Sequence, residues 1–157
     1  MALNIKDVAA WGEQWQSSGE WRAHTVGPLD AAKLAGGYLA FVGAVCGWRP
    51  QPQHTTGLDI GAGAGHLAAA FVQHGIGMTA SEWNDSGIEL MRRENPHLAT
   101  RKLDIMAFDD HEAWDFIFCR ELYPFTRVNA FSDQHAIISR LIDGLRSEEH
   151  TSELQSH

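Results

Sequence analysis

Three acidic side chains, Asp59, Glu82 and Asp104, each close a short apolar segment of the sequence. If these segments are neighbouring parallel strands, the acids lie at the carboxyl end of the sheet, where open α/β sheets bind their ligands. A carboxylate inside a strand, as at Asp59, costs several kcal/mol unless it is paired or solvated. An ammonium group on a ligand would supply such a partner, whereas a pyrophosphate would be repelled. Taken singly, each acid is also a common turn former or helix cap.

The residues directly after Asp59 form a glycine-rich turn, with Gly61, Gly63 and Gly65 alternating with alanine. Glycine lets a backbone turn sharply and approach a ligand without an intervening Cβ. The Gly-x-Gly pattern alone is weak evidence. His66 occupies the last position of a GxGxxG dinucleotide fingerprint, so the sequence disfavours NAD as the ligand.

The elements that must position these residues alternate along the chain. We predict strands over residues 57–61, 78–82, 99–104 and 115–119, and helices over 30–45, 65–74 and 84–94. A last helix is expected after Ser132, with Ile138, Leu141, Ile142 and Leu145 as its apolar positions. The 115–119 segment is continuously apolar, which is typical of a strand covered on both faces. This order predicts a Rossmann-like three-layer α/β/α fold with right-handed crossovers.

The composition narrows the classes of function. The 157 residues are 44% hydrophobic, and 12 Lys and Arg against 20 Asp and Glu give a net charge of -8. The acidic balance disfavours binding to nucleic acid. Cys46 and Cys119 lack a CxxC partner, which favours a reducing, cytoplasmic location. The longest apolar stretch, residues 34–48, is shorter than a membrane span requires. The N-terminal residues do not have the pattern of an export signal. The spacing of the histidines does not favour a metal site.

From residue 57 to residue 145 the sequence resembles the class I S-adenosylmethionine-dependent methyltransferases. The run from Asp59 to Gly65 looks like the first motif of that family, in which the glycine loop holds the methionine end of the cofactor and the acid interacts with it. The resemblance therefore implies S-adenosyl-L-methionine as the cofactor. The residues that it implies as cofactor contacts are Asp59, Gly61, Ala62, Gly63, Gly65, Glu82, Trp83, Asp104, Ile105 and Arg120.

Each of the later residues has a role that the resemblance implies. Glu82 would take the ribose hydroxyls, and Trp83 would lie against adenine. Asp104 would read the adenine amino group, with a backbone contact from Ile105. Arg120 follows the fourth strand, which in that family ends beside the sulfonium and the substrate.

The acceptor of a methyl group is not encoded in an evident motif, because the sulfonium is already a good leaving group and the protein mainly positions the reactants. Glu121 and Tyr123 are candidates for orienting or deprotonating an acceptor, although an ion pair for Glu121 and packing for Tyr123 are the favoured interpretations. Neither the Asn/Asp-Pro-Pro-Tyr motif nor the Pro-Cys motif of nucleobase enzymes is present, so a small-molecule or protein acceptor is expected. The alternatives are a noncatalytic adenosine-binding module and, less favoured, an NAD(P)-dependent reductase.

Three segments are expected along the chain. Residues 1–53 form an N-terminal helical cap, and residues 54–145 form a Rossmann-like domain that lacks the later strands of the family. Residues 146–157 resemble the translation of a sequencing adapter and are expected to be a non-native, disordered tail. In such a fragment the fourth strand would be an exposed edge, which predicts instability or insolubility.

Overall fold

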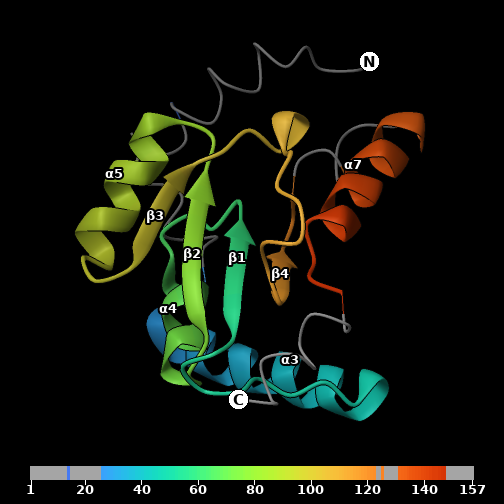
Figure 1. Ribbon diagram of the computed structural model, residues 1–157. Helices are drawn as coiled ribbons and strands as arrows, with labels where there is room; N and C mark the ends of the chain where they lie inside the picture. Colours follow the sequence, from blue (N-terminus) through green and yellow to red (C-terminus); the bar gives the residue numbers. More distant parts are fainter. Residues whose placement is uncertain (1–13, 15–25, 123–124, 126–130, 148–157) are drawn as a thin grey trace.

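A parallel four-stranded sheet with the order β3-β2-β1-β4 forms the centre of the computed structural model (Figure 1). Its strands are β1 (Thr56–Ile60), β2 (Gly77–Glu82), β3 (Ala99–Lys102) and β4 (Phe116–Cys119). The helices are α3 (Pro28–Cys46), α4 (His66–Gln73), α5 (Asp85–Glu94) and α7 (Phe131–Asp143), with a 3-10 turn η1 (Ile105–Ala107). The structure describes residues 14, 26–122, 125 and 131–147. The predicted α/β fold is confirmed.

The two faces of the sheet are covered by different helices, because side chains alternate along each strand. Helices α3, α4 and α5 share one apolar cluster with β2 and with Phe116 and Phe118 of β4. Helix α7 and η1 share the second cluster with Leu58 and Ile60 of β1. The sheet is therefore the middle of three layers, as predicted.

Helix α3 contacts α4 through small residues, with Ala31 and Ala35 fully buried. It begins at Pro28 after Gly27, two residues before the predicted start at residue 30, so Asp30 lies in its first turn. Among the described helices, α3 alone is long and apolar enough to cross a membrane, a test that core helices of soluble proteins also pass. The first part of the predicted N-terminal cap, residues 1–25 apart from Gln14, lies outside the described residues.

The predicted apolar face of α7 is right at Leu141 and wrong at Ile138, Ile142 and Leu145. Ile137 is fully buried and Leu141 packs against the same cluster, whereas Ile138 and Ile142 are exposed. Residues 137 and 141 are four apart and form one stripe of the helix. The sheet meets this stripe, and the neighbouring isoleucines face away from it. Ser132 lies inside the helix, which begins at Phe131.

Strand β4 contributes to both faces, as its continuous apolar sequence predicts. Phe116 and Phe118 join the α4 side, and Ile117 and Cys119 join the α7 side. Its residues are nevertheless only half-buried, because among the described strands β4 pairs with β1 alone. Beyond α7, Arg146 binds Asp115 at 2.9 Å, so the first residue of the expected tail is tied to the sheet. The residues from 148 onward lie outside the described part.

Candidate functional site

Strands β1 and β2 bring Asp59 and Glu82 together at their carboxyl ends. In the register of the sheet, Asp59 lies between Ala80 of β2 and Phe118 of β4. It is 2% exposed, and its carboxylate accepts no hydrogen bond from the described residues. The aligned neighbours are apolar, and no described residue donates a hydrogen bond to the Asp59 carboxylate.

Burial, and then the charge of Glu82, raise the pKa of Asp59 from 3.8 to about 7. Both effects disfavour the ionised form, one through desolvation and the other through repulsion between like charges. A carboxyl group poised near neutral pH in a ligand-binding position is typical of functional sites. A cation placed beside it would offset both penalties.

Glu82 is also buried, which raises its pKa, but two backbone N–H groups oppose this effect. Gly63 N–H donates to Oε1 at 3.0 Å, and Trp83 N–H donates to Oε2 at 3.3 Å. Hydrogen bonds to a carboxylate favour its charged form. Glu82 therefore keeps a partner on each oxygen while Asp59 has none, so the two neighbouring acids differ in character.

The turn between β1 and α4, residues 61–65, is the glycine loop of this protein. Gly61, Gly63 and Gly65 all have left-handed backbone angles, with φ values of 75°, 59° and 79°. Such angles suit glycine and strain other residues. A Cβ on Gly63 would meet open space, whereas one on Gly65 would approach Leu98 to 2.9 Å. The loop is therefore packed at its end and open at its middle.

The loop is attached to β2 as well as to its own ends. The N–H groups of Gly61 and Ala62 both donate to the carbonyl of Ser81 at 3.0 Å. Together with the bond from Gly63 to Glu82, these contacts hold the glycine loop across the carboxyl ends of β1 and β2. Five of the predicted cofactor contacts are thereby brought into one place: Asp59, Gly61, Ala62, Gly63 and Glu82.

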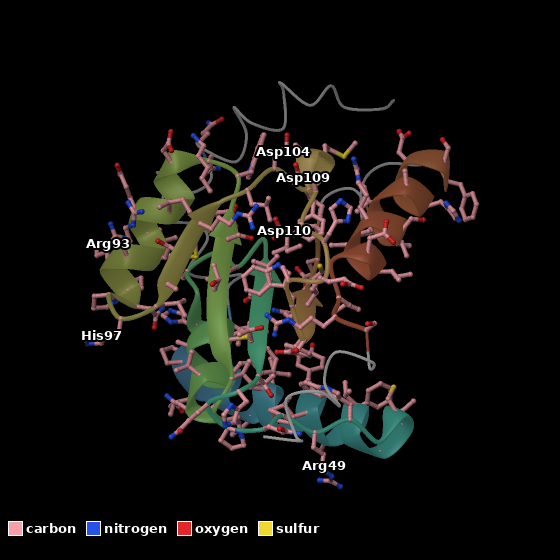
Figure 2. The ribbon with its side chains drawn as sticks, viewed as in Figure 1. Arg49, Arg93, His97, Asp104, Asp109 and Asp110 are labelled. Atoms are coloured by element: carbon pink, nitrogen blue, oxygen red, sulfur yellow. The ribbon has the colours of Figure 1, made fainter. Side chains whose placement is uncertain are left out.

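Asp104 does not close β3, contrary to the predicted strand end. The pairing of β2 with β3 stops at Glu82 and Lys102, because β2 itself ends there. Asp104 is exposed, and its carboxylate accepts a hydrogen bond from Met106 N–H at 2.9 Å, capping η1. Figure 2 places Asp104 and Asp109 toward the carboxyl ends of the strands, whereas Arg49 lies at the opposite end near α3. Asp104 therefore lies near the carboxyl ends of the strands, where its side chain caps η1.

The remaining predicted site residues divide between partly buried and exposed positions. Trp83 is half-buried beside Glu82, and the side chain of Ile105 packs in the α7-side cluster. Arg120 and Glu121 form an ion pair of 3.0 Å after β4, as the favoured interpretation of Glu121 expects. Tyr123 lies outside the described residues.

Sequence reasoning missed Asn95, which follows α5 and reaches back to the glycine loop. Its side-chain amide donates to the carbonyl of Ala64 at 2.8 Å and lies 3.2 Å from Nδ1 of His66. The sequence signal at this position, an Asn followed by Pro96 after a helix, indicated only where the helix ends.

Solved structures with a similar fold include proteins described as methyltransferases. A putative S-adenosylmethionine-dependent methyltransferase from Methanococcus maripaludis matches with a TM-score of 0.64 and 15% identity over 85% of this chain and 59% of its own. An amino pentose methyltransferase from Micromonospora echinaspora, solved with S-adenosylmethionine bound, matches with a TM-score of 0.62 and 17% identity over 82% and 51%. The DesVI protein of Streptomyces venezuelae matches with a TM-score of 0.61 and 14% identity over 74% and 47%. No protein-family model and no curated protein matches the sequence.

These matches establish the fold as the Rossmann-like α/β fold of S-adenosylmethionine-dependent methyltransferases. The chain spans about half the length of the solved structures that it matches. Fold alone does not define activity, so the function has to be argued from the site.

Proposed function

We propose that this chain binds S-adenosyl-L-methionine and belongs to a methyltransferase acting on a small-molecule or protein acceptor in the cytoplasm. The observation that carries the proposal is the pair of buried acids beside the glycine loop. Asp59 has no donor among the described residues, and Glu82 holds the loop through Gly63. An adenosyl ligand with an ammonium group and ribose hydroxyls fits both acids.

The residues present fit this cofactor better than a dinucleotide. A buried carboxyl group without a donor favours a cation, and the open space at Gly63 leaves room for a ligand against the backbone. Both acids would oppose the negative charges of a pyrophosphate. Asp59 would bind the charged methionine end, Glu82 the ribose hydroxyls, and Trp83 and Asp104 the adenine side.

The bound cofactor would supply a methyl group that is already activated by its sulfonium. The acceptor would donate an electron pair to that methyl, the carbon–sulfur bond would break, and S-adenosylhomocysteine would remain. For this reaction the chain has to hold the reactants in line and exclude water. Arg120 stands after β4 at the acceptor side, with Glu121 neutralising its charge.

Calorimetry of the chain with S-adenosylmethionine, S-adenosylhomocysteine and NAD tests the proposal. We expect binding of both adenosyl ligands and none of NAD. Preference for NAD would replace the proposal with a reductase, and transfer of labelled methyl from S-adenosylmethionine to a cell extract would separate an enzyme from a noncatalytic adenosine-binding module. Glu82→Gln is expected to weaken adenosyl binding about tenfold, because hydrogen bonds to charged groups contribute about 1.5–3 kcal/mol.

A further inference from the structure

We propose that Asn95 is a positioning residue that holds the glycine loop in its ligand-binding conformation. The inference rests on the proposed function, because the loop is taken to be the cofactor site. It starts from a contact between residues that are distant in sequence: the side chain of Asn95, after α5, donates to the carbonyl of Ala64 in the turn between β1 and α4.

The carbonyl of Ala64 depends on this contact. Ala64 is fully buried, and the amide of Asn95 donates to its oxygen at 2.8 Å. A buried carbonyl that loses its donor costs free energy comparable to that of a lost hydrogen bond. The carbonyl direction also fixes the plane of the peptide that leads into Gly65, whose N–H donates to Ala62 at 2.9 Å. Asn95 therefore sets the orientation of the peptide groups at the end of the loop.

His66 fixes the orientation of the Asn95 amide. Nδ1 of the His66 ring lies 3.2 Å from the amide nitrogen of Asn95, and it accepts the second N–H when the neutral ring carries its proton on Nε2. A flipped amide would set its oxygen against the carbonyl of Ala64, a repulsive contact, so both N–H groups of Asn95 are in use. Asn95, the carbonyl of Ala64 and the ring of His66 thus form one hydrogen-bonded group, which we call the clamp.

The contact is separate from the role of Asn95 in ending α5. The backbone N–H of Asn95 donates to Met91, and its backbone carbonyl accepts from Leu98 N–H, so a different side chain would leave both bonds in place. Leu98 and Met91 also pack where a Cβ on Gly65 would lie, at 2.9 and 3.4 Å. The turn after α5 thus abuts the end of the loop, and the Asn95 side chain adds the directional bond.

The glycine loop is consequently held from two sides. Glu82 binds the N–H of Gly63 on the side of β2, and Asn95 binds the carbonyl of Ala64 on the side of α5. Three left-handed glycines leave the unheld backbone with wide conformational freedom. Fixing it before the ligand arrives lowers the ordering cost of binding.

The test uses the full 157-residue chain with Asn95→Asp and Asn95→Ala, and with Ile88→Val as a control. Asn95→Asp keeps the shape of the side chain and removes its N–H donors. Ile88 is buried on α5 and does not contact the loop through any described hydrogen bond, so Ile88→Val lowers stability without removing the clamp. Affinity for S-adenosylmethionine is measured by calorimetry, and amide hydrogen exchange is measured without ligand.

We expect both Asn95 variants to exchange the amides of residues 63–69 about tenfold faster than Ile88→Val, and to bind S-adenosylmethionine about tenfold more weakly. Asn95→Asp behaving like wild type in both measurements would overturn the proposal, because packing alone would then suffice. Exchange rates in the loop equal to those of Ile88→Val would also overturn it. If wild type fails to bind the ligand, the proposed function fails, while the exchange comparison still decides whether Asn95 holds the loop.

Discussion

Replacement of Asp59 by Asn is expected to stabilise the fold at neutral pH and to weaken ligand binding. The folded-state pKa of Asp59 is about 7 against an ordinary value of 3.8. A raised carboxyl pKa means that the unfolded chain binds fewer protons than the folded protein between these two values. Stability is therefore lost as the pH rises from about 4 through 7, and the loss is complete above the folded pKa. At about 1.4 kcal/mol per pH unit, the full loss is about 4 kcal/mol.

Asparagine at position 59 stays neutral between pH 4 and pH 8, so the variant lacks this dependence of stability on pH. From pH 5 to pH 8, the free energy of unfolding of wild type should fall by about 2.5 kcal/mol relative to that of Asp59→Asn. Urea unfolding followed by tryptophan fluorescence at the two pH values measures this difference, and the contributions of groups that do not interact with Asp59 cancel in the comparison. Asp109→Asn serves as the control, because Asp109 is exposed and its replacement is expected to leave the difference near zero.

The affinity for the ligand should depend on pH in the opposite direction to the stability of the fold. A cationic ligand selects the ionised carboxylate, so the affinity of wild type for S-adenosylmethionine should rise from pH 5 to pH 8. Asp59→Asn should bind about tenfold or more weakly at pH 8, since a bond to a charged group contributes about 1.5–3 kcal/mol. An unfolding difference that is equal at both pH values would refute the assignment of the extra proton to Asp59. Unchanged affinity in the variant would refute its role in binding.

Three further predictions follow from the packing. Burial and the charge of Asp59 raise the pKa of Cys119 to about 12, so this thiol should resist a thiol reagent at pH 8 while exposed Cys46 reacts. Mass spectrometry after brief labelling measures the two reactions, and equal labelling rates at both cysteines would contradict the prediction. Gly65→Ala should destabilise the fold by about 1–3 kcal/mol, because its Cβ would meet Leu98 at 2.9 Å. Gly63→Ala should cost about 1 kcal/mol for backbone strain alone. Urea unfolding measures both variants, and midpoints in the reverse order would show the loop geometry to be wrong. Among the described residues, the side of β4 away from β1 is paired only just before the strand, where Trp114 bridges Leu145. The rest of this edge should cause self-association, so sedimentation velocity should show larger species as the protein concentration rises, and a monomer at every concentration would argue against an accessible edge.

The unit from β1 through the glycine loop to α4 was predictable because its signals are local. An apolar segment, alternating glycines and an alanine-rich helix follow one another within residues 56–73. Helix α5 was predicted as well, over residues 84–94, and the Asn84 side chain caps its start by accepting from Gly87 N–H. In each of these cases, a short run of residues carries its own physical reason.

The errors concern features that depend on distant partners. Ile137 and Ile138 are equally apolar in the sequence, and only the position of the sheet decides which of them is buried. The end of β3 depends on where β2 stops, which displaced Asp104 from the predicted strand end to the cap of η1. Asn95 binds Ala64 across 31 positions of sequence, and no local pattern encodes a contact of that kind.

The strand order also determines when each part of the sheet can assemble. Every neighbouring pair of described strands is parallel, so none of these pairs forms a hairpin, and the partners Gly57 and Phe116 are far apart in the chain. During synthesis β2 and β3 can dock on one side of β1 well before β4 emerges. The other side of β1 has to stay unpaired until then, and it is at that stage that a nascent chain of this topology most needs a chaperone.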